Sequence, residues 1–129
     1  MMEPLSEVVG VLDGARLLVV EDDFIISLEL QSVLGAAGAN VVATCHKVSD
    51  ALRAIHAKEV DVAVLDVKLG GETAAAVARE LARRHIPFLF YTGQTETDPT
   101  QTEWPAAPII AKPSPSRQIV AAVAQMLGR

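Results

Sequence analysis

The chain has 129 residues, enough for one compact domain, and 50% apolar but only 4% aromatic residues predict a core of Ala, Val, Ile and Leu. A formal net charge of −5 disfavours nucleic acid or anionic lipid as a partner, and a single cysteine, Cys45, excludes an intrachain disulfide and a cysteine metal cluster. No apolar run reaches the ~18–20 residues of a membrane span and no signal segment is visible, so we expect a cytoplasmic protein.

Residues 1–14 are predicted to form an N-terminal extension, and residues 15–129 the domain. The apolar residues of the extension follow the spacing of one helical face: Leu5, Val8, Val9 and Leu12. Two interpretations stay open. The extension is either a frayed tail or a short helix that docks on the domain or on a second copy, which would make the protein a homodimer.

Short apolar runs alternate with helical patterns along the domain. The predicted strands cover residues 17–20, 40–44, 61–65, 88–91 and 108–111. The first helix is predicted over residues 24–37, with Asp23 as its N-cap and Gly38 just past its end. The other helical faces are marked by Val48, Ala51, Leu52 and Ile55, then by Ala74, Val77, Ala78 and Leu81, and last by Ile119, Val123 and Met126.

The fourth helical position differs from the others. Residues 94–105 are rich in Thr, Gln and Pro and show no sustained helical stripe. Asp98 could cap a single turn in which Pro99 occupies the first helical position. The sequence therefore predicts a degenerate fourth helix.

This alternation predicts an α/β fold in which a parallel five-stranded sheet carries helices on both faces. Ligands of such sheets bind outside the carboxyl ends of the strands. The candidate functional residues are therefore the polar ones that end the strands: Glu21, Asp22, Asp66, Thr92 and Lys112.

Three of these candidates are acids that neighbouring strands would bring together. Two unit charges ~5 Å apart repel by roughly 3 kcal/mol at an effective dielectric of ~20. A hard divalent cation with oxygen ligands offsets such repulsion, and Mg²⁺ is a typical choice. The alternative is a solvated acidic rim. Lys112 on the same edge can hold a phosphoryl oxygen, and the Thr92 hydroxyl can bond to an oxygen that arrives at Asp66.

The order and spacing of these residues resemble the receiver domain of bacterial two-component response regulators. The resemblance runs from Arg16 to the C-terminus and rests on five residues: Glu21 and Asp22, Asp66 in Val-Leu-Asp, Thr92, and Lys112 before Pro113. It implies a flavodoxin-like (βα)5 fold with strand order 2-1-3-4-5 and transfer of phosphate from a histidine kinase to Asp66. It also implies Mg²⁺ bound by Asp22, Asp66 and the backbone carbonyl of Lys68, with Glu21 acting mainly through water, and often a cis Lys112-Pro113 bond.

The sequence departs from the usual receiver pattern beside the site. Ile109 stands where the family often has an aromatic switch residue, and Gly70 stands where it often has proline, which predicts a looser loop. Residues 87–94 also resemble the Phe-Ala-Thr-Gly-Tyr subgroup of single-domain receivers. That likeness implies alphaproteobacterial signalling and a related class of partner kinases.

The resemblance implies a stand-alone phosphoacceptor rather than an enzyme. No effector region is visible after the last helix, so output would be binding to an unidentified protein target or drainage of phosphate from a shared relay. A phosphatase of the haloacid-dehalogenase type needs a second aspartate where Lys68 stands. The main alternative is a receiver-like scaffold that binds a partner without being phosphorylated.

Overall fold

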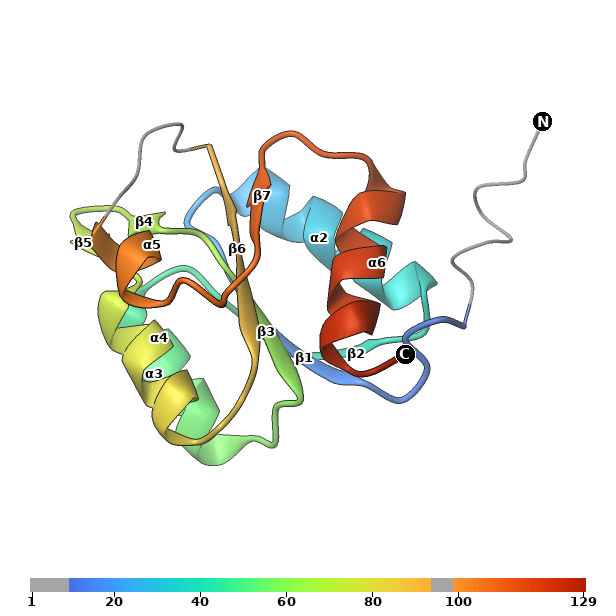
Figure 1. Ribbon diagram of the computed structural model, residues 1–129, viewed down its shortest axis with the longest axis horizontal. Coiled ribbons are helices and arrows are strands. Elements are labelled where there is room, and N and C mark those ends of the chain that lie inside the picture. The colour runs from blue at the N-terminus through green and yellow to red at the C-terminus, as the bar shows by residue number, and fades with distance from the viewer. Residues whose placement is uncertain (1–9, 94–98) are drawn as a thin grey trace.

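Five parallel strands form the centre of the protein in a computed structural model, which describes residues 10–93 and 99–129 (Figure 1). The strands are β1 (Arg16–Val20), β2 (Asn40–Cys45), β3 (Val62–Leu65), β6 (Phe88–Thr92) and β7 (Ile109–Ala111). They lie in the order β2-β1-β3-β6-β7, and each neighbouring pair is parallel. The flavodoxin-like fold and the 2-1-3-4-5 order of its five strands are thus confirmed.

Helices cover both faces of this sheet, as predicted. They are α2 (Phe24–Ala36), α3 (Val48–Ala57), α4 (Ala75–Arg83), α5 (Pro99–Glu103) and α6 (Ser116–Met126). Figure 1 shows α3 and α4 on one face and α2 and α6 on the other. The fourth crossover carries α5, which is a short helix that begins at Pro99. This confirms the prediction of a degenerate fourth helix, although Asp98 lies outside the described residues.

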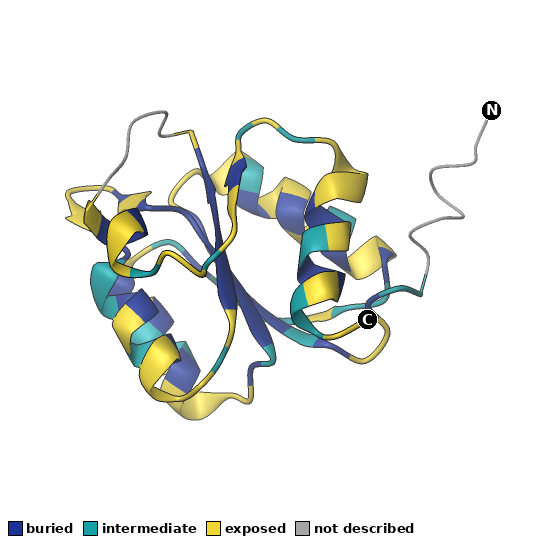
Figure 2. Cartoon of the chain, viewed as in Figure 1, coloured by how far each residue is buried: buried dark blue, intermediate teal, exposed yellow. Residues whose placement is uncertain are grey.

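The strands contribute side chains to two separate cores, one on each face of the sheet, because their side chains alternate between the faces. In β1, Leu18 and Val20 pack with α3 and α4, whereas Leu17 and Val19 pack with α2 and α6. β3 and β6 are buried along their whole length, and β1 is buried from Leu17 to Val20 (Figure 2). Trp104, after α5, packs its ring against Phe88 with the centroids 6.1 Å apart and so extends the first core.

The ends of α2 show how local sequence sets the strand-to-helix turn at the acidic edge. The Asp23 carboxylate accepts hydrogen bonds from the amides of Ile25 and Ile26 at 2.9 and 3.1 Å, which confirms it as the N-cap. At the other end Gly38 has φ +103°, a left-handed conformation that suits glycine. The acids before α2 therefore stand on a well-defined turn.

A hairpin that the sequence did not predict follows β3. Its strands are β4 (Lys68–Leu69) and β5 (Glu72–Thr73), paired antiparallel around Gly70-Gly71. Leu69 is buried in the first core and anchors the hairpin. The looser loop expected at this place is instead a tight turn, in which Gly70 adopts φ +65°.

The residues just before β1 pack tightly onto the domain. Leu12 is completely buried in the second core, and its amide donates to the carbonyl of Ala37 at 2.8 Å. The Arg129 guanidinium donates to the carbonyls of Val11 and Asp13. The proposed boundary after residue 14 stays a prediction, and the rest of the predicted apolar stripe lies outside the described residues.

Among the described residues, none of the helices has the length and apolar character that crossing a membrane requires.

Candidate functional site

The polar residues predicted at the strand ends do meet at one edge of the sheet. The backbone hydrogen bonds between neighbouring strands continue one residue beyond the strands and hold these polar residues in place. The Glu21 amide donates to Cys45, the Asp66 amide to Val20, and the Lys112 amide to Thr92, at 2.9, 2.9 and 3.0 Å. Each side chain thus starts from a backbone position that the neighbouring strand has already ordered.

Three carboxylates gather at this edge. Glu21, Asp22 and Asp66 each place one oxygen within 4.8 Å of the others. Glu21 is 1% exposed and Asp66 8% exposed, whereas Asp22 faces solvent. The Lys112 ammonium bridges the two buried acids, with Nζ 2.6 Å from Glu21 Oε1 and 2.9 Å from Asp66 Oδ2. The Lys112 ammonium is thus shared between two of the three carboxylates in this cluster.

The pKa values of Glu21 and Lys112 reflect both their burial and the charges of this cluster. The pKa of Glu21 is raised to about 7, chiefly by burial and also by the nearby Asp66 charge, against the opposing effects of the Lys112 ion pair and the Asp23 amide. Burial alone would lower the pKa of Lys112, but hydrogen bonds to Glu21 and Asp66 outweigh it and the pKa is raised. In the Glu21–Lys112 ion pair, the charged form is therefore disfavoured for the buried Glu21 carboxylate and favoured for the Lys112 ammonium.

This donor set fits a hard divalent cation. The carboxylates supply oxygen ligands from two strand ends, and the raised pKa of Glu21 reflects first its burial and then the nearby Asp66 charge. Mg²⁺ prefers such ligands, usually one or two carboxylates together with water and phosphate oxygens. Asp22, the exposed member, lies where an ion from solvent would arrive first.

The raised pKa of Glu21 predicts a pH-dependent stability. Glu21 is protonated in both states below pH ~4.5, its ordinary pKa, but only in the folded state between there and about 7. The unfolding free energy of the metal-free protein should therefore fall as pH rises through this window, because the unfolded state releases the proton first. Urea unfolding in a chelator at pH 5 and pH 8 measures the difference. It should shrink in Glu21→Gln but not in the exposed control Glu29→Gln, and equal slopes in all three proteins would contradict the assignment.

A model of the response regulator receiver domain family matches residues 17–124. The chain belongs to the receiver domain family. Receiver domains are signalling phosphoacceptor domains, and they bind Mg²⁺ through acidic residues like those gathered here. A sequence comparison with curated proteins found no match.

Solved structures that resemble this receiver include SdrG from Sphingomonas melonis Fr1, which is 33% identical with a TM-score of 0.76. The match covers 91% of this chain and 98% of the SdrG chain. The HemR receiver domain from Leptospira biflexa is 24% identical over 89% of this chain and 95% of its own, with a TM-score of 0.77. PhyR from Brucella abortus is 21% identical over 92% of this chain, with a TM-score of 0.75. The match covers 50% of PhyR, so this chain spans about half of that protein.

Thr92 and Ile109 lie on neighbouring strands of the receiver. Thr92 is buried at the end of β6, next to the backbone of Lys112, as the sequence predicted. Ile109 begins β7 and is largely exposed, so an aliphatic side chain occupies the usual switch position. The Lys112-Pro113 bond is cis, which confirms the implication of the resemblance.

Two contacts of the receiver site were not predicted. The Lys112 ammonium lies 5.7 Å from the centroid of the Tyr91 ring, within the range of a cation–π interaction. The His46 ring nitrogen Nδ1 lies 2.8 Å from the carbonyl oxygen of Glu21. Both partners adjoin predicted strand ends, but no sequence spacing indicates that their rings turn toward the site.

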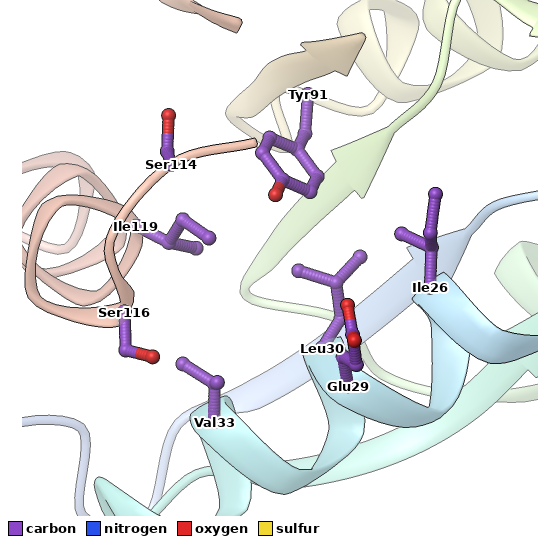
Figure 3. A pocket seen from close by; sticks show the side chains of 8 residues that line it. All are labelled: Ile26, Glu29, Leu30, Val33, Tyr91, Ser114, Ser116 and Ile119. Atoms are coloured by element: carbon purple, nitrogen blue, oxygen red, sulfur yellow. The ribbon is translucent and has the colours of Figure 1, made fainter. Parts of the chain in front are cut away.

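A groove of about 350 Å³ lies between α2 and α6, next to the receiver site (Figure 3). Tyr91 forms part of its wall, so the residue that contacts Lys112 also faces this groove. The other lining side chains come from α2, the segment before α6, and α6 itself: Ile26, Glu29, Leu30, Val33, Ser114, Ser116 and Ile119.

Proposed function

We propose that this receiver accepts a phosphoryl group on Asp66 from a histidine kinase, with Mg²⁺ bound at the acidic edge. The observation that carries the proposal is the position of Asp66, a nearly buried carboxylate at the open end of β3, with Lys112 Nζ 2.9 Å from its Oδ2. A carboxylate held in this way is open to an incoming phosphoryl group, and the Lys112 ammonium beside it can bind an oxygen of that group.

In the proposed reaction, an oxygen of Asp66 attacks the phosphorus of a phosphohistidine. The new bond joins the carboxylate oxygen to phosphorus, the nitrogen–phosphorus bond breaks, and the leaving imidazole keeps the electron pair and takes a proton from solvent. Lys112 shifts its contact from Asp66 to a phosphoryl oxygen, and the Thr92 hydroxyl donates to another. Lys112 already contacts Asp66, and the backbone carbonyl of Thr92 already accepts a hydrogen bond from the Lys112 amide.

The residues that would hold Mg²⁺ are Asp22, Asp66 and the backbone carbonyl of Lys68, with Glu21 acting mainly through water. Lys68 opens β4 directly after the site, and one oxygen from each of the three acids lies within 4.8 Å of the others. When bound, Mg²⁺ supplies positive charge against the phosphoryl oxygens.

An apolar surface beside the site supports a protein as phosphodonor. The first turns of α2 expose Phe24, Ile25 and Leu28 by 63, 67 and 47%. These side chains follow directly after the acids of the β1 end. Large apolar side chains grouped next to a site indicate a protein interface. The output would be altered binding to a protein target, or drainage of phosphate from a shared relay.

The proposal is tested by the mass of the intact protein after incubation with Mg²⁺ and acetyl phosphate. Wild-type protein should gain the mass of one phosphoryl group, and Asp66→Asn should gain none, because an amide cannot form the acyl phosphate. The loss should be complete rather than partial. Chelation of the metal should strongly slow the gain in the wild type.

The matched control is Asp50→Asn, the same substitution at an exposed carboxylate of α3. It should gain the phosphoryl group like the wild type. An equal gain in Asp66→Asn, or no gain in any protein, would overturn the proposal. The second result would favour the alternative, a receiver-like scaffold that binds its partner without phosphorylation.

A further inference from the structure

The β4–β5 hairpin reaches back to the acidic cluster through one hydrogen bond. The backbone amide of Gly70 donates to Asp22 Oδ2 at 2.9 Å. The two residues are far apart in sequence, and Asp22 is the exposed member of the three carboxylates. An exposed carboxylate has several accessible rotamers, so a fixed donor on one oxygen restricts the directions in which the other can point.

The hairpin makes Gly70 a well-defined donor. Lys68 pairs with Thr73 and Leu69 with Glu72, so Gly70 sits in the turn with φ +65°. Leu69 is buried in the core and ties the hairpin to the domain. The amide of Gly70 is therefore held by the tight turn and by an anchored neighbour.

Receivers often carry proline at this position, but in the turn of this chain the position uses both a free N–H and a left-handed backbone. Proline has no N–H and has φ near −65°, so it can supply neither. Asparagine retains the N–H and tolerates the left-handed region better than other side chains. A Cβ added at Gly70 would meet nothing within 4 Å, so the site has room for a side chain.

We infer that Gly70 is a positioning residue for metal binding, whose amide orients the Asp22 carboxylate before the cation arrives. The inference rests on the proposed function in one respect, namely that Mg²⁺ binds at this edge. Groups that orient metal ligands by hydrogen bonds typically change metal affinity by about 10–100-fold when they are removed. Because Asp22 is exposed, we expect the lower end of this range.

The test is a calorimetric titration of the full chain with Mg²⁺ in the absence of any phosphodonor. Gly70→Pro should bind Mg²⁺ about tenfold more weakly than the wild type. Gly70→Asn should bind within about twofold of the wild type, because it keeps the donor and the backbone conformation. Gly71→Ala is the matched control, since Gly71 has no positive φ and its Cβ would meet nothing within 4 Å.

A second arm separates positioning from general damage to the hairpin. In the Asp22→Asn background, Gly70→Pro should change the remaining Mg²⁺ affinity by less than about twofold, because the residue acts through Asp22. A distorted hairpin would weaken binding in both backgrounds. The inference is overturned if Gly70→Pro binds as tightly as the wild type, if Gly70→Asn loses as much as Gly70→Pro, or if the loss persists in Asp22→Asn.

The outcomes also distinguish this inference from the proposed function. If Gly70→Pro keeps the wild-type Mg²⁺ affinity while Asp66→Asn still abolishes phosphoryl uptake, the inference about Gly70 fails and the proposed function stands. If the wild type binds no Mg²⁺, both are overturned. A tenfold loss in Gly70→Pro that Gly70→Asn does not share supports the inference whether or not acetyl phosphate is a donor.

Discussion

Lys112→Met should lower the unfolding free energy of the metal-free protein by about 3 kcal/mol at pH 8. The substitution removes the ammonium that lies 2.6 Å from Glu21 Oε1 and 2.9 Å from Asp66 Oδ2, and leaves two buried carboxylates facing each other. Methionine keeps most of the aliphatic stem, so packing contributes little to the loss. The expected value is at the lower end for a broken buried ion pair, because the Lys112 side chain is 15% exposed.

Urea unfolding at pH 6 and pH 8, with chelator and with excess Mg²⁺, measures this effect and its cause. The loss should be smaller at pH 6, where Glu21 can take up a proton, and smaller with Mg²⁺, which replaces the missing charge. Lys68→Met is the matched control, because Lys68 is exposed beside the same site and should cost less than about 0.5 kcal/mol. A Lys112→Met protein as stable as this control would show that the pair contributes nothing.

Leu12→Ala should destabilise the protein by about 3 kcal/mol, although Leu12 precedes the first strand. Its side chain is completely buried in the core beneath α2 and α6, and its backbone is fixed by the bond to Ala37. Truncation leaves a cavity in a region that the rest of the chain cannot readily fill. A chain that starts at residue 15 should lose at least as much.

Leu28→Ala provides the same substitution at an exposed position of α2, and it should change stability by less than about 0.5 kcal/mol. Urea unfolding of the two variants therefore separates burial from residue type. If Leu12→Ala matched Leu28→Ala, residues 10–14 would be a dispensable extension. If the expected loss is found, the folded domain includes Leu12 and begins before the predicted boundary.

The strands and the acidic edge could be predicted because both depend on local sequence. A run such as Leu17 to Val20 is apolar at every position, as a strand covered on both faces requires, and the acids that follow it must lie at the strand end. The same reasoning placed Asp66 and Lys112 correctly. The weak fourth helix was equally local, because the Pro and Thr content around Pro99 cannot support a long amphipathic helix.

The contacts that orient the site could not be predicted in this way. Gly70 meets Asp22, Tyr91 meets Lys112, and His46 meets the backbone of Glu21, each across two different elements. A Gly-Gly pair is a known hairpin signal, and it could have indicated the turn between Lys68 and Thr73. It could not have indicated which carboxylate the turn would face.

By itself, the sequence determined the type and order of the elements, the edge at which the charged residues gather, and the chemistry available there. The elements follow from apolar periodicity within short segments. The edge follows from the alternation of strands and helices, which makes the strands parallel and brings their carboxyl ends together. Only the tertiary structure decided that Leu12 belongs to the core, that Lys112 bridges Glu21 and Asp66, and that Gly70 donates to Asp22. Such contacts depend on the packing of elements distant in sequence, which no local pattern specifies.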